Sequence, residues 1–261
     1  MLLYYMNIAD LDLNQVKDKV SENRWKYSKK YIYQKDKLLS LGGEALLNYL
    51  LKKIKIHDPI FINNSLGKPC LKNYPEVHFN ISHSEKYVFC GVSYLPIGLD
   101  IECIHKIDLS IAKTQFHQKE YEYIINSQNK YEAFFKIWVL KESYLKMTGI
   151  GLKSKLNSFF IDIGENNNIK VFKNKNHQNY HSHDNIQKYH NYLKNKKLIE
   201  DYKNYNNIEN IEYLKFSNKH ENGIKFKHLN IIDDKKNEYA LAVCAFEKIG
   251  KLKFIETEKI L

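Results

Sequence analysis

The amino-acid sequence predicts an α+β fold in which long helices pack on small antiparallel sheets. Two stretches, residues 36–53 and 130–147, carry apolar side chains at the three- and four-residue spacing of a helix. Between them the chain has short apolar runs separated by turn residues, which is typical of antiparallel strands. A chain of 261 residues with 43% hydrophobic residues can bury a sizeable core, so disorder throughout is excluded.

The first half begins with an expected edge strand in the opening sequence MLLYYMNI, followed by the long helix at 36–53. Gly42 and Gly43 lie in the middle of that helix, where each costs roughly 1 kcal/mol relative to Ala. We therefore expect either a bend there or a close approach by another segment. The strands expected next, with a turn at 63–67, are residues 61–62, 77–82 (VHFNIS), 87–93 (YVFCGVS) and 97–102 (IGLDIE).

The second half is expected to contain two helices and two strands. The helices are at 109–125 and 130–147, and the strands are at 159–163 and 238–246 (EYALAVCAF). Between these strands the chain is rich in Asn and Lys and lacks hydrophobic periodicity, so we interpret about 165–235 as an inserted loop. It contains four histidines that no Cys or carboxylate joins at metal-ligand spacing, namely His177, His181, His183 and His190.

The charge and the cysteines narrow the class of protein. The formal net charge is +11, from 41 Lys and Arg against 30 Asp and Glu, which predicts an anionic partner. The four cysteines form no C-x-x-C pair, so neither a disulfide framework nor a zinc knuckle is expected. The N-terminus lacks the basic segment of a secretory signal, and the apolar stretch 87–99 is too short to span a bilayer. We expect a cytoplasmic monomer that does not bind a membrane.

Three carboxylates form the strongest candidate site. Asp100 and Glu102 are separated by one residue at the end of a predicted strand, so both side chains lie on the same face. In the second long helix, Trp138, Glu142 and Lys146 are four residues apart and share one face. Three carboxylates without a cysteine ligand suit a hard cation such as Mg²⁺, which implies a phosphorylated substrate. These carboxylates could instead have no site role, with Asp100 and Glu102 at a solvent-exposed strand end and Glu142 on the solvent-exposed face of a helix.

Five short motifs occur in order along the chain. They are G-K-P at 67–69, F-N-I-S-H-S at 79–84, G-L-D-I-E at 98–102, F-x-x-x-E at 116–120 and W-x-x-K-E-S-x-x-K at 138–146. A lone turn lysine such as Lys68 is normally solvated, and a lone histidine such as His83 is more often structural than catalytic. Together, however, the order and spacing resemble the 4'-phosphopantetheinyl transferase superfamily, specifically its larger surfactin-synthetase-activating (Sfp) type. The resemblance covers most of residues 1–163 and resumes at the strand YALAVC.

The resemblance implies an enzyme that transfers the 4'-phosphopantetheine group of coenzyme A to a serine of an apo acyl or peptidyl carrier protein, releasing adenosine 3',5'-bisphosphate. It implies two similar α+β halves, residues 1–96 and 97–261, related by a pseudo-twofold axis. Each half would hold a small antiparallel sheet and a long helix, with the active site at their junction. Asp100, Glu102 and Glu142 would be the Mg²⁺ ligands.

The resemblance also assigns the turn, serine, histidine and lysine residues of the other motifs to coenzyme A. Gly67, Lys68 and Pro69 would border the adenine and ribose, Ser82 and His83 would contact the nucleotide phosphates, and Lys141 and Lys146 would reach the pyrophosphate. Coenzyme A carries about four negative charges at neutral pH, so cationic donors around it are expected.

Catalysis would depend on Glu142, Glu120 and Lys146, with one of the two glutamates taking the proton of the carrier serine as it attacks phosphorus. The contacts to the 3'-phosphate of coenzyme A depart from the family pattern. Arg24 fits one of them, but Leu39 stands where family members often carry an arginine.

A Mg²⁺-dependent nuclease or phosphodiesterase is the alternative enzyme, because D-x-E followed by a glutamate–lysine pair also occurs there and the basic charge suits DNA. It would use Asp100, Glu102 and Glu142, but it leaves the G-K-P and S-H-S motifs without a role. A non-enzymatic binding protein would require loss of a ligand residue, and none is missing. We therefore expect coenzyme A and a carrier protein as partners, and no nucleic acid. The insertion lies away from every motif, so its deletion should leave transfer intact.

Overall fold

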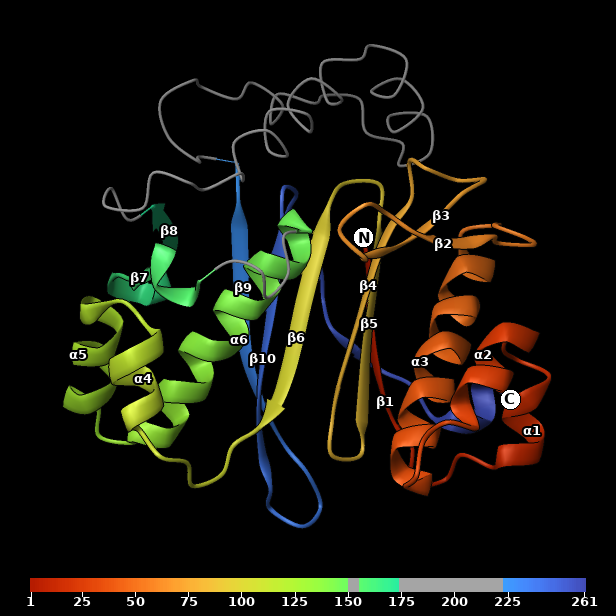
Figure 1. Cartoon of the computed structure of the whole chain (residues 1–261), viewed down its shortest axis with the longest axis horizontal. Coiled ribbons are helices and arrows are strands. Elements are labelled where there is room, and N and C mark those ends of the chain that lie inside the picture. Colours follow the sequence, from red (N-terminus) through yellow and green to blue (C-terminus); the bar gives the residue numbers. More distant parts are fainter. Residues whose placement is uncertain (150–154, 174–222) are drawn as a thin grey trace.

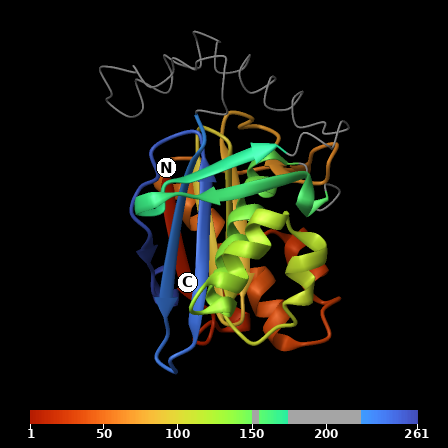
Figure 2. The ribbon, with the colours of Figure 1, turned by 90° about the vertical axis from the view of Figure 1, so that its left-hand side faces the viewer.

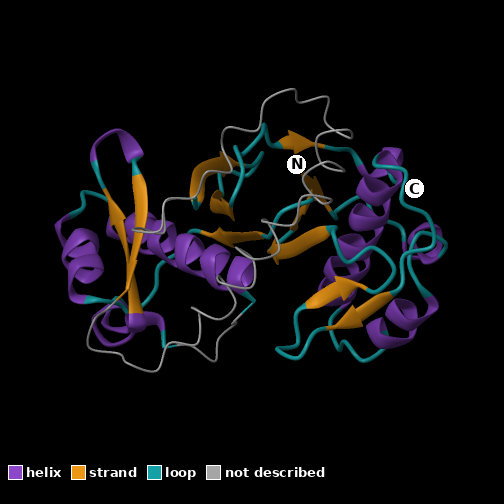
Figure 3. Cartoon of the chain, turned by 90° about the horizontal axis from the view of Figure 1, so that it is seen from above, coloured by secondary structure: helices purple, strands orange, loops and turns teal. Residues whose placement is uncertain are grey.

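The computed structural model describes residues 1–149, 155–173 and 223–261. It has the α+β fold predicted from the sequence, with helices on two outer sides and strands between them (Figures 1 and 3). The elements up to residue 93 are β1 (Leu2–Asn7), α1 (Leu13–Lys17), α2 (Glu22–Ser28), α3 (Gln34–Lys53), β2 (Phe61–Asn63), β3 (Pro69–Leu71), β4 (His78–Ser84) and β5 (Tyr87–Ser93). Those that follow are β6 (Ile97–Cys103), α4 (Ser110–Gln115), α5 (Gln118–Asn126), α6 (Lys130–Thr148), β7 (Phe159–Ile163), β8 (Ile169–Lys173), β9 (Lys225–Ile232), β10 (Glu238–Ala245) and β11 (Lys253–Phe254).

Two sheets form the middle of the molecule. The first has the strand order β11-β1-β5-β4, in which β11 is parallel to β1 and the other neighbours are antiparallel. The second has the order β6-β10-β9 and is antiparallel. Two further hairpins, β2–β3 and β7–β8, pair outside these sheets. Because α3 packs on the first sheet and α6 on the second, the layers run helix, sheet, sheet, helix (Figure 1).

Side chains of β6 alternate between two surroundings. Ile97, Leu99 and Ile101 belong to the core between the two sheets. Because successive strand residues point to opposite faces, the intervening side chains face α6. Asp100 and Glu102 therefore share one side of β6, as the sequence predicts.

The two glycines in α3 reflect a close approach and not a bend. The helix runs unbroken from Gln34 to Lys53 through both of them. A Cβ atom on Gly42 would lie 2.7 Å from Cε of Met6, closer than real side chains pack. The absence of a side chain at Gly42 thus leaves room for the Met6 side chain of β1 against α3, at a cost in helix propensity.

Three expectations about the elements need correction. β1 is not an edge strand, because β11 pairs with its outer side. The single helix expected at 109–125 is two helices, since the chain is extended at Phe116 and His117 caps the start of α5. The inserted loop is shorter than about 165–235, because β8 pairs with β7 and β9 with β10, so deletion of that whole segment would remove two strands. Its four histidines lie outside the described residues.

The four cysteines are free thiols. Burial raises the pKa of Cys90, so this thiol stays protonated and unreactive. Across residues 1–149, 155–173 and 223–261, no helix combines the length and apolar character that crossing a membrane requires.

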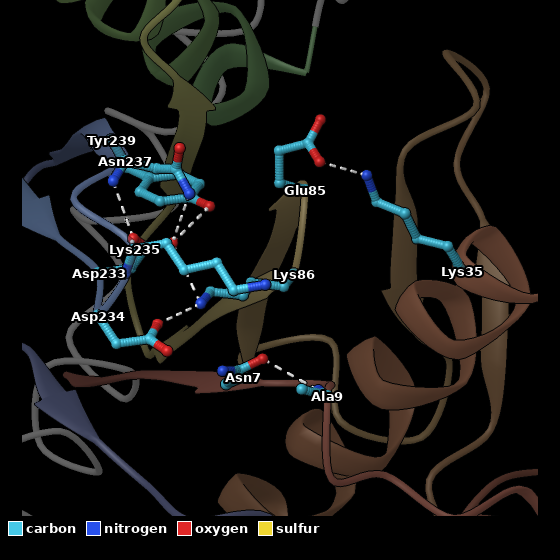
Figure 4. A network of polar contacts seen from close by, with 10 residues as sticks. All are labelled: Asn7, Ala9, Lys35, Glu85, Lys86, Asp233, Asp234, Lys235, Asn237 and Tyr239. Carbon is cyan, nitrogen blue, oxygen red and sulfur yellow. Dashed lines mark hydrogen bonds and ion pairs between the residues drawn. The ribbon is translucent and has the colours of Figure 1, made fainter.

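A network of polar contacts joins the two sheets at one end (Figure 4). Lys86, in the turn between β4 and β5, forms ion pairs with Asp233 (3.1 Å) and Asp234 (2.6 Å) in the turn between β9 and β10. The Asp233 side chain has no exposed surface and accepts further hydrogen bonds from within its own turn. Glu85, beside Lys86, pairs with Lys35 of α3. The turn that follows β4 is therefore anchored to both a helix of the first half and a turn of the second.

Candidate active site

The candidate site lies along the seam where β4 of the first sheet runs beside β6 of the second (Figure 1). Side chains of β4 bridge the two strands. Asn80 Oδ1 accepts a hydrogen bond from the backbone nitrogen of Leu99 (2.8 Å), and Ser84 Oγ accepts one from the backbone nitrogen of Cys103 (2.9 Å). These contacts join β4, an edge strand of the first sheet, to β6, an edge strand of the second, through side chains.

The same face of β4 supplies one hydroxyl group to each carboxylate of β6. Ser82 Oγ donates to Asp100 Oδ1 at 2.7 Å, and Ser84 Oγ donates to Glu102 Oε2 at 3.2 Å. The match follows from the period of two in both strands, because residues 82 and 84 lie on one side of β4 and residues 100 and 102 on one side of β6.

α6 lies directly on β6 because Gly98 has no side chain. A Cβ atom at this position would be 2.0 Å from the carbonyl oxygen of Ser143 and 2.2 Å from the amide nitrogen of Met147. This close approach is the structural reason for the glycine in G-L-D-I-E. It brings the face of α6 that carries Glu142 and Lys146 against the carboxylates of β6.

Two side chains of α6 lie at the β6 carboxylates. Lys146 Nζ donates to Asp100 Oδ1 (2.6 Å) and to Ser82 Oγ (3.0 Å). The side chain of Trp138 lies near Glu102 and slightly opposes the rise in its pKa. The spacing of Trp138, Glu142 and Lys146 predicts one common helix face, and this face lies against the seam between β4 and β6.

Burial makes negative charge costly in this cluster. Asp100 is 3% exposed and Glu142 is 9% exposed. Burial, together with the nearby charge of Asp100, raises the pKa of Glu142, and the same two causes raise the pKa of Glu102 to about 7. Asp100 Oδ2 and Glu142 Oε1 are buried and accept no hydrogen bond within the described part of the chain. Such acceptors are costly unless a cation or donor satisfies them.

The chemistry of this cluster fits Mg²⁺. The donors are carboxylate oxygens, which Mg²⁺ prefers, and two of the buried oxygens have no partner among the described residues. Within the same residues, no three His, Cys, Asp or Glu side chains are already arranged around one point as a metal site. The ammonium group of Lys146 lies against Asp100 instead. Asp100, Glu102 and Glu142 would therefore have to draw together to hold the ion.

The G-K-P motif lies at the end of α6. Gly67 adopts a φ of +87° in the turn between β2 and β3, and Pro69 is exposed at the start of β3. Lys68 Nζ donates to the backbone carbonyl oxygens of Lys146 (2.6 Å) and Ile97 (3.2 Å). Burial lowers the pKa of Lys68 to about 8. Lys68 therefore caps carbonyl groups at the C-terminal end of α6, where a cation is favourable, and is not simply solvated.

Glu120 and Lys141 form a buried ion pair between α5 and α6, and Lys141 also reaches the backbone of β7. Figure 2 shows these helices beside the β7–β8 hairpin. Lys141 Nζ donates to both carboxylate oxygens of Glu120 (2.7 and 2.8 Å) and to the carbonyl oxygen of Phe159 (2.8 Å). Glu120 also accepts hydrogen bonds from the backbone nitrogens of His117 (3.0 Å) and Ile161 (2.7 Å). Neither side chain of the pair has exposed surface.

In this arrangement Glu120 and Lys141 are occupied by each other, and the roles expected for Glu120 as a catalytic base and for Lys141 as a pyrophosphate ligand stay predictions. The three donors of the Lys141 ammonium group and both oxygens of Glu120 are occupied by protein groups. The sequence places Lys141 beside Glu142, but adjacent helix residues point about 100° apart, so Lys141 faces α5 while Glu142 faces β6.

The remaining predicted ligands are not gathered at the carboxylates. His83 is exposed and follows Ser82 in β4, so the two side chains leave the strand on opposite faces. Arg24 pairs with Glu44 of α3 (2.9 Å), with about a third of its side chain exposed. Leu39 is buried in the core of the first half, where an arginine would lack a partner.

Ser84 and Asn80 are the site residues that the sequence interpretation missed. Their signal is nevertheless present, since polar residues at 80, 82 and 84 recur with a period of two in a strand that precedes G-L-D-I-E. The pattern identifies a polar strand face but does not say which strand lies opposite, and β4 and β6 belong to different sheets.

Comparisons with known proteins identify the same family that the order of the motifs indicates. The family model described as the 4'-phosphopantetheinyl transferase superfamily matches residues 96–205. The chain is 37% identical over 167 residues to the 4'-phosphopantetheinyl transferase gsp of Aneurinibacillus migulanus, covering 62% of this chain and 70% of the relative. It is 30% identical over 157 residues to the 4'-phosphopantetheinyl transferase Sfp of Bacillus subtilis (strain 168), covering 58% and 70%. It is 32% identical over 162 residues to the 4'-phosphopantetheinyl transferase psf-1 of Bacillus pumilus, covering 60% and 70%.

Proposed function

Since the chain belongs to the 4'-phosphopantetheinyl transferase superfamily and is of the Sfp type, we propose that it transfers 4'-phosphopantetheine from coenzyme A to a serine of an apo acyl or peptidyl carrier protein. The carrier serine oxygen forms a bond to the phosphorus that bears the pantetheine arm. The bond from that phosphorus to the bridging oxygen of the pyrophosphate breaks, and adenosine 3',5'-bisphosphate leaves with its electron pair. The serine proton passes to a base.

The buried carboxylate cluster at the seam is the observation that carries this proposal. Asp100, Glu102 and Glu142 would hold Mg²⁺, which when bound offsets the negative charge of the pyrophosphate. The oxygens of Asp100 and Glu142 that lack a partner among the described residues, and the raised pKa values of Glu102 and Glu142, support a cation there. Lys146, with 28% of its side chain exposed, can donate to phosphate oxygens from the solvent-facing side of the cluster.

Glu142 is the better of the two candidate bases. Glu120 has its oxygens occupied by Lys141 and by backbone nitrogens, whereas Glu142 Oε1 accepts no hydrogen bond among the described residues. Burial raises the pKa of Glu142, which makes its carboxylate a stronger proton acceptor than that of an ordinary glutamate. A base positioned in this way contributes about 10²- to 10⁴-fold to a rate.

The coenzyme would lie between the seam and the β2–β3 turn. Gly67 and Pro69 flank Lys68, whose contact with the carbonyl of Lys146 places this turn beside α6, and this supports a role for the turn in bordering the adenine and ribose. His83 and Arg24 stay proposals for the nucleotide phosphates, since both retain exposed surface.

We propose further that the two halves, 1–96 and 97–261, are related by a pseudo-twofold axis with the active site at their junction. Each half supplies a long helix and three strands of one main sheet, β1, β5 and β4 in the first and β6, β10 and β9 in the second, which supports this. Action as a monomer in the cytoplasm stays a prediction. The nuclease alternative gains no support, because the relatives named above are transferases.

Mass spectrometry of a carrier protein tests the proposal directly. The protein is incubated with coenzyme A, Mg²⁺ and an apo carrier, and the carrier should gain the mass of one phosphopantetheine group. A carrier with its acceptor serine replaced by alanine should gain nothing. Absence of any gain with several acyl and peptidyl carriers would overturn the assignment, and an equal gain in the presence of a chelator would overturn the role of Mg²⁺.

A further inference from the structure

We infer that Ser84 is a positioning residue that orients the carboxylate of Glu102 for metal binding, with Ser82 doing the same for Asp100. The inference deepens the proposed function and rests on it, because it assumes that these carboxylates hold a cation. Nothing in the motif assignments gives Ser84 a role.

The direction of the Ser84 hydroxyl is set by its two contacts. A backbone N–H can only donate, so the contact with the Cys103 nitrogen (2.9 Å) makes Ser84 Oγ an acceptor there. The single hydroxyl proton is then free to point at Glu102 Oε2, 3.2 Å away. Ser84 is therefore a donor to Glu102, held in that orientation by the backbone of β6 itself.

Glu102 is held from β4 by Ser84, whose hydroxyl group donates to its Oε2, and the side chain of Trp138 lies near it from α6. Asp100 is held by Ser82 from β4 and by Lys146 from α6, and its second oxygen has no partner among the described residues. Outer hydrogen bonds of this kind fix the orientation of metal-binding carboxylates, and their loss commonly costs 10- to 100-fold in metal affinity.

The chain next to Ser84 is anchored, which keeps the hydroxyl in place. Ser84 is the last residue of β4, and Glu85 and Lys86 follow it. Lys86 is paired with the buried Asp233 of the second half, and Glu85 is paired with α3 (Figure 4). A hydroxyl from one sheet can therefore act reproducibly on a carboxylate of the other.

The test measures Mn²⁺ binding, by titration calorimetry on the full chain, and carrier modification in parallel. Ser84→Ala should raise the Kd for Mn²⁺ by about 10- to 100-fold. Ser84→Thr, which keeps the hydroxyl group, should bind as the wild type does, and Ser84→Cys, a weak donor of similar size, should fall between. Ser93→Ala is the matched control, because Ser93 is also the last residue of its strand and also donates to a glutamate, Glu247, which is not one of the three proposed ligands.

Thermal melting establishes that each variant is folded, and Ser84→Cys and Ser84→Thr decide the matter if Ser84→Ala does not fold. If Ser84→Ala and Ser84→Cys bind Mn²⁺ as tightly as the wild type does, the inference is overturned. The proposed transfer of phosphopantetheine would still stand. A wild type that binds no Mn²⁺ would overturn the inference too. If Ser84→Ala binds Mn²⁺ more weakly than the wild type, but the wild type modifies no carrier, the inference is supported and the proposed function is overturned.

Discussion

Replacing Lys141 with Met should destabilise the protein strongly without removing a substrate contact. The variant leaves the Glu120 carboxylate, which has no exposed surface, without its cation. Breaking a buried ion pair from one side costs about 3–5 kcal/mol, because the remaining charge is uncompensated. For a chain of this size that corresponds to a fall in melting temperature of roughly 6 to 20 °C.

Urea unfolding and thermal melting measure the loss of stability, and carrier modification is assayed at a temperature where the variant is fully folded. The double variant Glu120→Gln, Lys141→Met should recover much of the lost stability, because no buried charge remains. Lys35→Met is the matched control, since Lys35 and Glu85 are both about half exposed and such pairs contribute at most about 1 kcal/mol. A Lys141→Met variant as stable as the wild type, with a raised KM for coenzyme A, would show that Lys141 binds the pyrophosphate and that the buried pair is misassigned.

Two further changes test the pH dependence and the packing of the site. The pKa of Glu102 is about 7 in the folded chain against 4.5 for the ordinary carboxyl, so its stabilising contribution is complete below about pH 4.5 and is lost as pH rises through 7. In metal-free buffer, the melting temperature of the wild type should therefore fall more between pH 5 and 8 than that of Glu102→Gln, and identical pH profiles would refute this. Gly98→Ala should cost about 3 kcal/mol or more in urea unfolding, because the new Cβ would lie 2.0 Å from a backbone oxygen of α6. Gly250→Ala, whose Cβ would meet its nearest neighbour at 3.9 Å, should be tolerated, and equal stability of the two variants would contradict the close packing of α6 on β6.

Periodicity was sufficient to predict the parts of the site that lie within one element. The spacing of Asp100 and Glu102 in a strand fixes their common face, and the spacing of Trp138, Glu142 and Lys146 fixes a common face of α6. Both faces are found together at the seam. Local geometry of this kind depends only on the pitch of a helix or the pleat of a strand.

Contacts between elements could not be predicted in the same way. Motif order predicts roles for Glu120 and Lys141 at the reaction centre, but it does not predict that their side chains pair with each other between α5 and α6. Ser84 was missed because its partner lies in the other sheet. The sequence does not predict β11, because this strand has only two residues, Lys253–Phe254, which show no alternating pattern and form a strand by pairing with β1.

The mass of an apo carrier incubated with the Asp100→Asn variant tests most directly whether the carboxylates at the seam support the proposed Mg²⁺-dependent transfer. The substitution keeps the size of the side chain and removes only its charge, so the fold should persist while the metal loses a ligand. With coenzyme A and Mg²⁺ present, the wild type should add one phosphopantetheine group to the carrier, and Asp100→Asn should do so at least about 100-fold more slowly. Transfer by folded Asp100→Asn at the wild-type rate would contradict the proposed role of these carboxylates.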